Sequence, residues 1–68
     1  MFNYSKLRGR MVEKGFTMKS LADKLPFSEW SLGMKLRGRF DFKQSEILAI
    51  CRLLDIPSAD IGLYFFAV

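Results

Sequence analysis

Residues 17–38 read TMKSLADKLPFSEWSLGMKLRG, and this stretch determines the fold that we predict for the chain. Thr17 is a good helix N-cap, and the apolar face behind it predicts a helix over residues 18–25. That face consists of Leu21, Ala22 and Leu25. Pro26 ends the run, because proline cannot donate to a helix interior and restricts the residue before it. The stretch therefore begins with a two-turn helix and a tight connection.

A second helix is expected directly after this connection, over residues 29–37. Ser28 is an N-cap, and Leu32 and Leu36 are spaced to fix the helix on a core. Gly38 is well placed to end the helix in the left-handed conformation. Two short helices joined by a tight turn, with basic residues around them, are the ingredients of a helix-turn-helix, whose second helix enters the major groove of DNA.

Apolar patterns on either side predict three further helices, over residues 4–14, 44–54 and 59–64. Asn3 or Ser5 can cap the first of them, Gly15 can end it, and Ser58 is expected to cap the last. No strand is predicted apart from an extended tail at 65–68. The predicted fold class is all-α, with residues 1–68 forming one domain of five short helices.

The composition weighs against an enzyme. The 68 residues include one Cys and no His, so a Ser-His or Cys-His catalytic pair, an internal disulfide and a conventional zinc site are excluded. We therefore assign no catalytic residue, metal ligand or cofactor, and expect no small-molecule substrate. A domain this small must gain its stability from helix packing, in which Cys51 is expected to be buried.

The basic charge is concentrated in one part of the chain. Residues 1–39 hold nine Lys and Arg against three Asp and Glu, a net charge of +6, whereas residues 40–68 hold two against four, a net charge of −2. Such asymmetry indicates a polyanion-binding side, although a solvated basic surface is the plain alternative. With no apolar run of about 18 residues and no apolar leader, we expect a cytoplasmic protein without a membrane segment.

Residues 17–38 resemble the helix-turn-helix of Cro/C1-type phage repressors, the XRE family. The resemblance is carried by Thr17, the Leu21-Ala22 pair, Leu25, Ser28, Leu32 and the exit Lys35-Leu36-Arg37-Gly38. It extends over nearly the whole chain, since the later part is similar to the end of small repressors from phages and prophages of Gram-positive bacteria. That part comprises Phe42, Glu46-Ile47, Ile50-Cys51, Leu54, Ile56 and Ile61 through Tyr64-Phe65-Phe66.

The resemblance implies a compact, five-helix, lambda-repressor-like domain that binds double-stranded operator DNA, usually as a homodimer and without a cofactor. It also implies a location at the nucleoid of a bacterial or phage-infected cell. Two positions depart from the family pattern. Met18 stands where the family usually has a phosphate-binding Gln, and Pro26 stands where it usually has Gly.

Matched onto the family, the base-reading positions are Ser28, Glu29, Trp30, Gly33 and Met34. Glu29 can accept a hydrogen bond from cytosine, while Trp30 or Met34 can pack on thymine methyl groups. Two alternatives are open: Glu29 can serve only the helix dipole, and Trp30 can be a core residue, although its offset from Leu32 favours exposure.

The predicted phosphate contacts are Thr17, Lys19, Lys35, Arg37 and Arg39. Clustering of the last three at the exit of the second helix favours phosphate binding over a merely solvated run. At the other end of the chain, the consecutive rings of Tyr64, Phe65 and Phe66 cannot all point inward. We expect at least one to fill the core and one or two to form a dimer interface.

These features predict a sequence-specific transcriptional regulator, a repressor that occludes a promoter by binding operator DNA. An alternative of another class is a protein-interaction module on the same fold, such as an antirepressor or an antitoxin component. The adjacent Glu29 and Trp30 are its best support, because Trp is a typical interface anchor and the reading helix has few hydrogen-bond donors.

Overall fold

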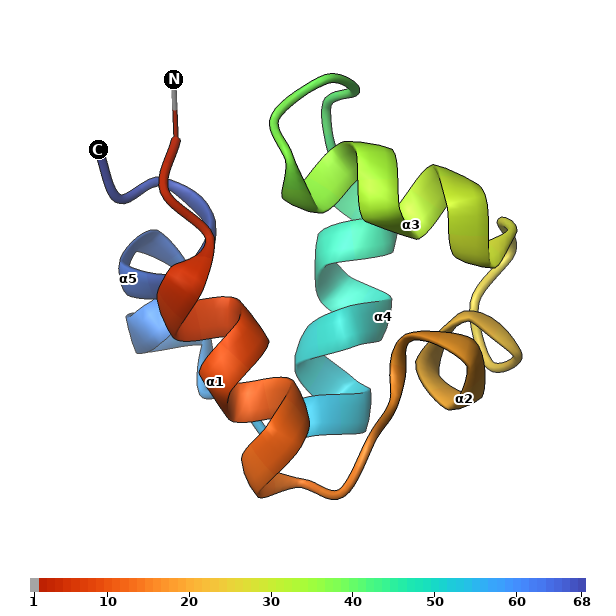
Figure 1. The fold of residues 1–68 in the computed structure, drawn as a ribbon. Helices are drawn as coiled ribbons and strands as arrows, with labels where there is room; N and C mark the ends of the chain where they lie inside the picture. The colour runs from red at the N-terminus through yellow and green to blue at the C-terminus, as the bar shows by residue number, and fades with distance from the viewer. Residues whose placement is uncertain (1) are drawn as a thin grey trace.

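The computed structural model describes residues 2–68, which form five α-helices and one short 3-10 helix (Figure 1). The elements are α1 (Ser5–Glu13), α2 (Met18–Ala22), α3 (Glu29–Leu36), α4 (Gln44–Leu54), η1 (Ser58–Asp60) and α5 (Ile61–Phe65). The prediction of an all-α fold with five helices is confirmed, and the bounds of α4 agree with the predicted 44–54. Among residues 2–68, no helix is both long and apolar enough to cross a bilayer.

Helix α4 stands at the centre of the fold, with α1 and α5 on one side of it and α2 and α3 on the other (Figure 1). The two ends of the chain meet beside α1 and α5, where the backbone N–H of Asn3 donates to the carbonyl oxygen of Ala67 at 2.6 Å. The largest fully buried side chains come from α1 to α5: Leu7, Leu21, Leu32, Ile50, Leu54 and Phe65. Cys51 is buried with them, as predicted.

Helix α2 begins as predicted but ends three residues early. The Thr17 hydroxyl accepts from the Ser20 N–H at 3.0 Å, and the Ser20 hydroxyl accepts from the Thr17 N–H at 2.9 Å, so both ends of this capping box are satisfied. After Ala22 the chain tightens, and Leu25 N–H donates to the Ala22 carbonyl three residues back. Pro26 explains this change, because the residue before a proline avoids the helical region.

Helices α1 and α3 end as predicted, on glycines in the left-handed region. Gly15 has φ +78° and Gly38 has φ +77°. In both cases the N–H of the residue after the glycine donates to a carbonyl five residues earlier. Phe16 donates to Met11 and Arg39 donates to Met34, each at 2.9 Å. This arrangement is the Schellman motif, which satisfies carbonyls that a helix end would leave without partners.

Helix α4 ends in the same way without a glycine. Asp55 adopts φ +53°, a conformation that costs a non-glycine residue free energy, and the chain around it supplies compensating contacts. Lys14 Nζ lies 2.6 Å from the Asp55 carboxylate, which lowers the pKa of that carboxyl group. The Arg10 guanidinium donates to the carbonyl oxygens of Leu54 at 2.9 Å and Asp55 at 3.1 Å. Arg10 of α1 and Lys14, the residue directly after this helix, therefore neutralise the negative end of α4.

The last helix differs from its prediction over residues 59–64. Pro57 (φ −63°) leads into the 3-10 turn η1, in which Asp60 N–H donates to the Pro57 carbonyl at 2.9 Å. The expectation that Ser58 caps this helix is wrong, because Ser58 is the first residue of the turn and Pro57 occupies the capping position. At the start of the chain, neither Asn3 nor Ser5 occupies the capping position of α1, which Tyr4 holds without a side-chain hydrogen bond. Asn3 lies one residue earlier, and its Oδ1 accepts from the Ser5 N–H at 2.8 Å.

A buried ion pair joins α3 to α4. Lys35 and Glu46 are each only 7% exposed, and Lys35 Nζ lies 3.1 Å from Glu46 Oε1. Lys35 also donates to the backbone carbonyl of Asp41 at 3.0 Å, while Glu46 Oε1 accepts from the Lys43 N–H at 2.8 Å. The pair therefore fixes both helices and the loop between them.

Two aromatic rings complete the surroundings of the Lys35 ammonium, which lies 5.0 Å from the Phe27 centroid and 6.0 Å from that of Phe42. Burial alone would raise the pKa of Glu46. The hydrogen bond from the Lys43 N–H and the ion pair with Lys35 outweigh burial and hold that pKa below its ordinary value.

We expect Lys35→Met to lower the free energy of unfolding by about 3 kcal/mol, because it leaves a buried carboxylate without its counter-charge. Urea denaturation followed by circular dichroism measures the change. Lys24→Met is the matched control, since Lys24 is exposed and has no ion-pair partner among residues 2–68. A loss of less than about 0.5 kcal/mol in Lys35→Met, the range of ordinary surface substitutions, would contradict this role.

The lowered pKa of Glu46 also predicts a pH dependence. A carboxyl group whose pKa is lower in the folded state adds stability above its ordinary pKa, and that stability is lost as the pH falls through the folded-state value. Asp55 acts in the same direction, so the wild type must be compared with Glu46→Gln. We expect the stability advantage of the wild type over Glu46→Gln to be full at pH 7 and to shrink below about pH 4.5. If the difference in unfolding free energy between the wild type and Glu46→Gln stays constant from pH 7 to about pH 3, the predicted pH dependence is wrong.

Candidate nucleic-acid interface

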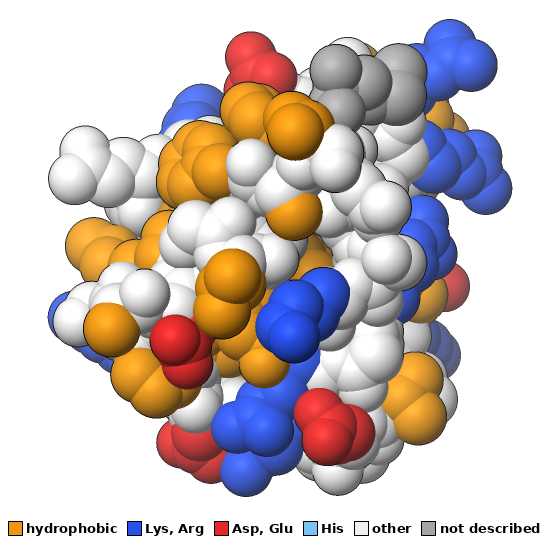
Figure 2. All heavy atoms as spheres, turned by 90° about the vertical axis from the view of Figure 1, so that its left-hand side faces the viewer, with side chains coloured by type: hydrophobic (Ala, Val, Ile, Leu, Met, Phe, Trp, Pro, Cys, Tyr) orange, Lys and Arg blue, Asp and Glu red, His pale blue; other side chains and the backbone are white. Residues whose placement is uncertain are grey.

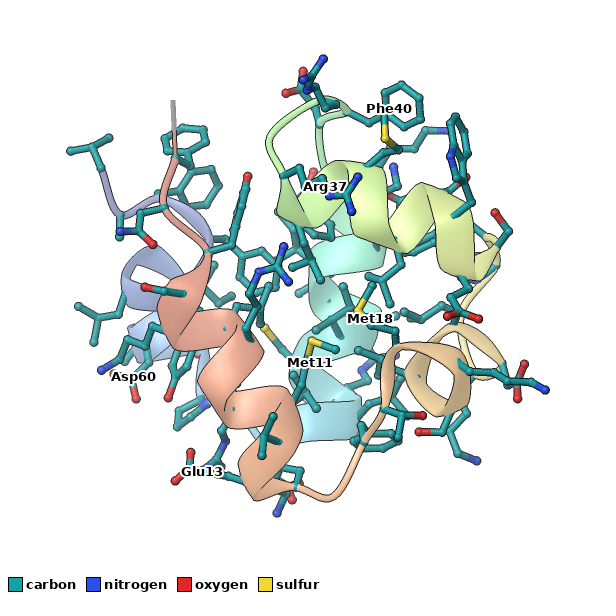
Figure 3. The ribbon with its side chains drawn as sticks, in the orientation of Figure 1. Met11, Glu13, Met18, Arg37, Phe40 and Asp60 are labelled. Atoms are coloured by element: carbon teal, nitrogen blue, oxygen red, sulfur yellow. The ribbon has the colours of Figure 1, made fainter. Side chains whose placement is uncertain are left out.

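The exposed side of α3 and the start of α2 form a shallow depression of about 480 Å³, which we call the α2–α3 surface. It is lined by Met18, Glu29, Trp30, Gly33 and Arg37. Met18 lies between the two helices, and Arg37 projects from the end of α3 (Figure 3). The fold thus brings three of the five predicted base-reading residues together with one of the predicted phosphate contacts.

Trp30 is the most prominent side chain of this surface. It is 65% exposed, so the prediction of exposure is confirmed and a place in the core is excluded. Its ring packs edge to face against Phe40, with centroids 5.6 Å apart and planes at 72°. Phe40 is itself 41% exposed and stands on the loop above α3 (Figure 3). Phe40 lies in a loop outside any helical period, so no local pattern predicts its partnership with Trp30.

The other predicted base-reading and capping residues lie close by. Met34 is half-buried and Glu29 is exposed in the first turn of α3. The Ser28 hydroxyl accepts from the Ser31 N–H at 3.1 Å and lies 3.2 Å from the Ser31 hydroxyl, so it caps α3 as predicted. Ser28 and the capping Thr17 thus hold the N-termini of α3 and α2, and DNA contacts by either hydroxyl stay predictions.

The structure contradicts one predicted phosphate contact. Lys35 is buried and paired with Glu46, so its ammonium is not available to a phosphate at the surface. Lys35 follows Leu32 by three residues and precedes Leu36, and this spacing places it on the inner face of α3. The helical period could therefore have indicated that Lys35 points inward. It could not have identified the partner, Glu46, which lies on α4.

Six basic side chains of residues 2–39 remain outside ion pairs, and Arg37 among them lines the α2–α3 surface. Of the nine Lys and Arg in residues 1–39, Arg10, Lys14 and Lys35 are held in ion pairs. The other six are exposed and have no carboxylate within 4.0 Å in the described part of the chain: Lys6, Arg8, Lys19, Lys24, Arg37 and Arg39. Figure 2 shows that Lys and Arg side chains also gather along one edge and at the foot of the face that carries α1 and α5.

The C-terminal aromatic residues divide between core and surface. Phe65 is 1% exposed and packs edge to face on Phe42 at 5.3 Å, so its assignment to a dimer interface is wrong. The expectation that at least one of the three rings fills the core is confirmed. Phe66 is 51% exposed, and Tyr64 is half-buried with Lys6 Nζ 5.6 Å from its ring centroid.

Residues 1–68, the whole chain, match the family described as "Protein of unknown function (DUF739)". The chain belongs to this family. No curated protein matches it. Because that description assigns no activity, the function of this DUF739 protein must be argued from the surfaces described above.

The floor of the α2–α3 surface gives a testable prediction. A Cβ atom at Gly33 would lie 3.8 Å from the Met18 methyl group, an ordinary contact, and α3 has helical geometry there. We therefore expect Gly33→Ala to raise the free energy of unfolding by about 0.5–1 kcal/mol through helix propensity. Gly9→Ala, in open space on α1, is the control and should gain a similar amount in thermal or urea denaturation. A loss of stability in Gly33→Ala alone would show that the fold requires glycine at this position.

Proposed function

We propose that this protein is a sequence-specific DNA-binding transcriptional regulator, a repressor of Cro/C1 type that occludes a promoter. In this proposal α2, the connection over residues 23–28 and α3 act as the helix-turn-helix of a lambda-repressor-like domain. The observation that carries the proposal is the α2–α3 surface itself, where the exposed face of α3 carries Arg37 and the exposed Lys19 and Arg39 lie within two residues of its lining. A polyanion with a groove wide enough for an α-helix is the natural complement of such a surface.

Affinity and sequence preference have different sources on this surface. Lys19, Arg37 and Arg39 are exposed and would neutralise phosphates, which releases counterions and makes binding salt-dependent. Met18 cannot donate to a phosphate and instead lies beside Gly33. Base recognition is therefore expected to rely on Glu29 as an acceptor and on apolar contact from Trp30 and Met34 with thymine methyl groups.

Repression of this type usually needs two copies of the domain on one operator. The exposed side chains of α5 and the tail, Leu63 and Phe66, together with the half-buried Tyr64, are the proposed contact between copies. A homodimer doubles the number of phosphate and base contacts and reads two half-sites about one helical turn apart. The proposed location is the nucleoid of a bacterial or phage-infected cell.

A second candidate function is a protein-interaction module, as in an antirepressor or an antitoxin component. The specific observation in its favour is the exposed pair of Trp30 and Phe40, because exposed aromatic side chains are typical anchors of protein interfaces. Glu29 beside Trp30 adds a negative charge that suits a protein partner better than a phosphate backbone. DNA binding at low salt distinguishes the two candidates.

Selection on random duplexes, followed by titration at about 50–200 mM salt, tests the proposal. We expect Arg37→Ala and Arg39→Ala to weaken binding to all sequences and to lower the salt slope by up to about one each. Arg52→Ala, an exposed arginine of α4, is the control and should leave the slope unchanged. Trp30→Ala should change the preference among sequences instead.

Two results would overturn this proposal. An absence of DNA binding at about 50 mM salt would favour the protein partner. If DNA binds but Trp30→Ala leaves the affinity for every selected sequence unchanged, the α2–α3 surface does not read bases.

A further inference from the structure

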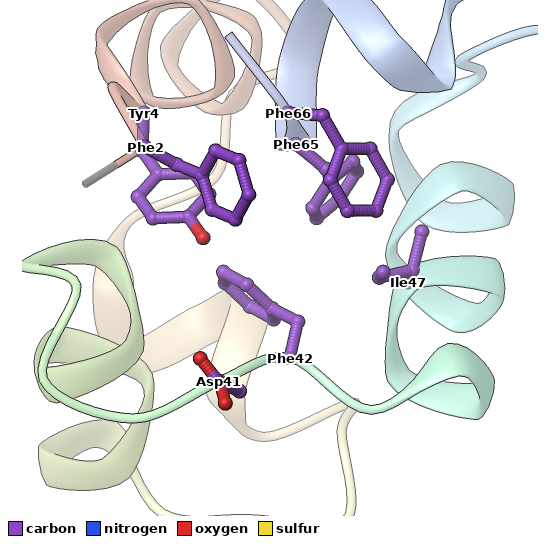
Figure 4. A pocket seen from close by; sticks show the side chains of 7 residues that line it. All are labelled: Phe2, Tyr4, Asp41, Phe42, Ile47, Phe65 and Phe66. Atoms are coloured by element: carbon purple, nitrogen blue, oxygen red, sulfur yellow. The ribbon is translucent and has the colours of Figure 1, made fainter. Parts of the chain in front are cut away.

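A second hollow lies on the far side of the loop that follows α3. Its volume is about 310 Å³, and it opens between the N-terminal segment, this loop, the start of α4 and the C-terminal tail. Five aromatic residues and one acid supply most of its wall: Phe2, Tyr4, Asp41, Phe42, Phe65 and Phe66 (Figure 4). We call it the aromatic pocket. None of these residues is a predicted DNA contact or lines the α2–α3 surface. Phe66 also belongs to the proposed contact between two copies of the chain.

The rings form a continuous wall. Phe66 packs on Phe2 with centroids 5.4 Å apart, Phe2 on Tyr4 at 6.4 Å, and Tyr4 on Phe42 at 5.4 Å. The planes of these pairs are inclined by 65–89°, so neighbouring rings turn in different directions. Because the faces of aromatic rings carry partial negative charge, a ring whose face borders the hollow attracts a cation.

The pocket also carries a formal negative charge, that of the Asp41 carboxylate. Asp41 is exposed at its edge and has no cation within 4.0 Å among residues 2–68. Lys35 lies 6.0 Å from the Phe42 centroid, but Glu46 at 3.1 Å neutralises its charge. Burial, and after it the charge of Asp41, raises the pKa of Tyr4, so this phenol stays neutral and adds no second anion.

We propose that the aromatic pocket binds a small organic cation whose charge is spread over alkyl groups, such as a quaternary ammonium group. Its volume, at the lower end of ligand pockets, fits a head group rather than a large molecule. A quaternary ammonium ion needs no hydrogen bonds, and the polar side-chain groups of the lining residues are the Asp41 carboxylate and the Tyr4 hydroxyl, which points into the hollow (Figure 4). The proposal does not depend on DNA binding.

The exposure of the two outer rings makes this site accessible. Phe2 is 41% and Phe66 51% exposed, and their rings meet edge to face at the rim (Figure 4). Hydrophobic side chains are visible on the neighbouring face of α1 and α5 (Figure 2), where a second copy of the chain is the competing occupant. The experiment below distinguishes the two.

The test is an NMR titration of the full chain with choline chloride, which replaces sodium chloride at constant ionic strength. We expect saturable shifts of the Phe2, Tyr4, Asp41 and Phe66 signals, with a dissociation constant of about 1–10 mM for so small a ligand. The neutral analogue 3,3-dimethylbutan-1-ol has the same shape without the charge and should bind at least about fivefold more weakly. Ammonium chloride, which must give up strong hydration, should cause no saturable shift.

Two variants locate the charge recognition. Asp41→Asn should weaken choline binding about threefold to tenfold and leave the neutral analogue unaffected. Asp23→Asn removes the same charge from the residue directly after α2 and should change neither affinity. Phe2→Leu keeps an apolar wall but removes one ring face, and it should also weaken choline selectively. Because both residues are exposed, these variants are expected to fold, which circular dichroism checks.

Equal affinity for choline and the neutral analogue would overturn the proposal and leave an ordinary apolar hollow. An absence of saturable shifts with choline would also overturn it. Sedimentation at the NMR concentration then reveals whether the chain self-associates. If a second copy fills the pocket, dilution of the protein should shift the NMR signals of Phe2 and Phe66.

Discussion

The ion pair between Lys35 and Glu46 sets the orientation of α3, on which the proposed function depends. Helix α3 has only eight residues, and the rotation about its axis decides which side chains face outward. A buried ammonium needs its carboxylate close by, and moving the pair apart leaves two uncompensated charges. The main contribution of the ion pair is therefore to restrict α3 to one rotation about its axis rather than to add a large net stabilisation. In this rotation Leu32 and Leu36 point inward and Trp30 points outward.

The same interaction changes how the basic composition is interpreted. A count along the sequence assigns +6 to residues 1–39, but the fold uses three of those cations internally. Lys35 fixes α3, while Arg10 and Lys14 hold the C-terminal end of α4, where Asp55 adopts an unfavourable backbone conformation. The remaining basic residues are exposed, and Arg37 lines the α2–α3 surface. A basic surplus thus contains structural cations that only three-dimensional contacts separate from surface charge.

Local signals predicted most of the fold, and contacts distant in sequence account for what they missed. Caps and left-handed glycines depend on a few adjacent residues, so Thr17, Gly15 and Gly38 were identified correctly. The period of α3 likewise placed Trp30 outside. The burial of Lys35 depends on a partner 11 residues away, and the contact of Arg10 with Leu54 spans 44 residues. No pattern within one helix contains either partner.

The loop between α3 and α4 connects the two surfaces that the structure singles out. Phe40 packs on Trp30 at the α2–α3 surface, while Asp41 and Phe42 line the aromatic pocket. Lys35 holds the carbonyl oxygen of Asp41, so the loop is tied to the inner face of α3 between these two contacts. An occupant of the pocket would influence the α2–α3 surface only if it bound two arrangements of this loop with different affinity. Lys35 also pairs with Glu46, so any second arrangement of the loop that releases the Asp41 carbonyl must change the surroundings of a buried charge. The free energy that this change requires opposes motion of the loop in the unliganded protein.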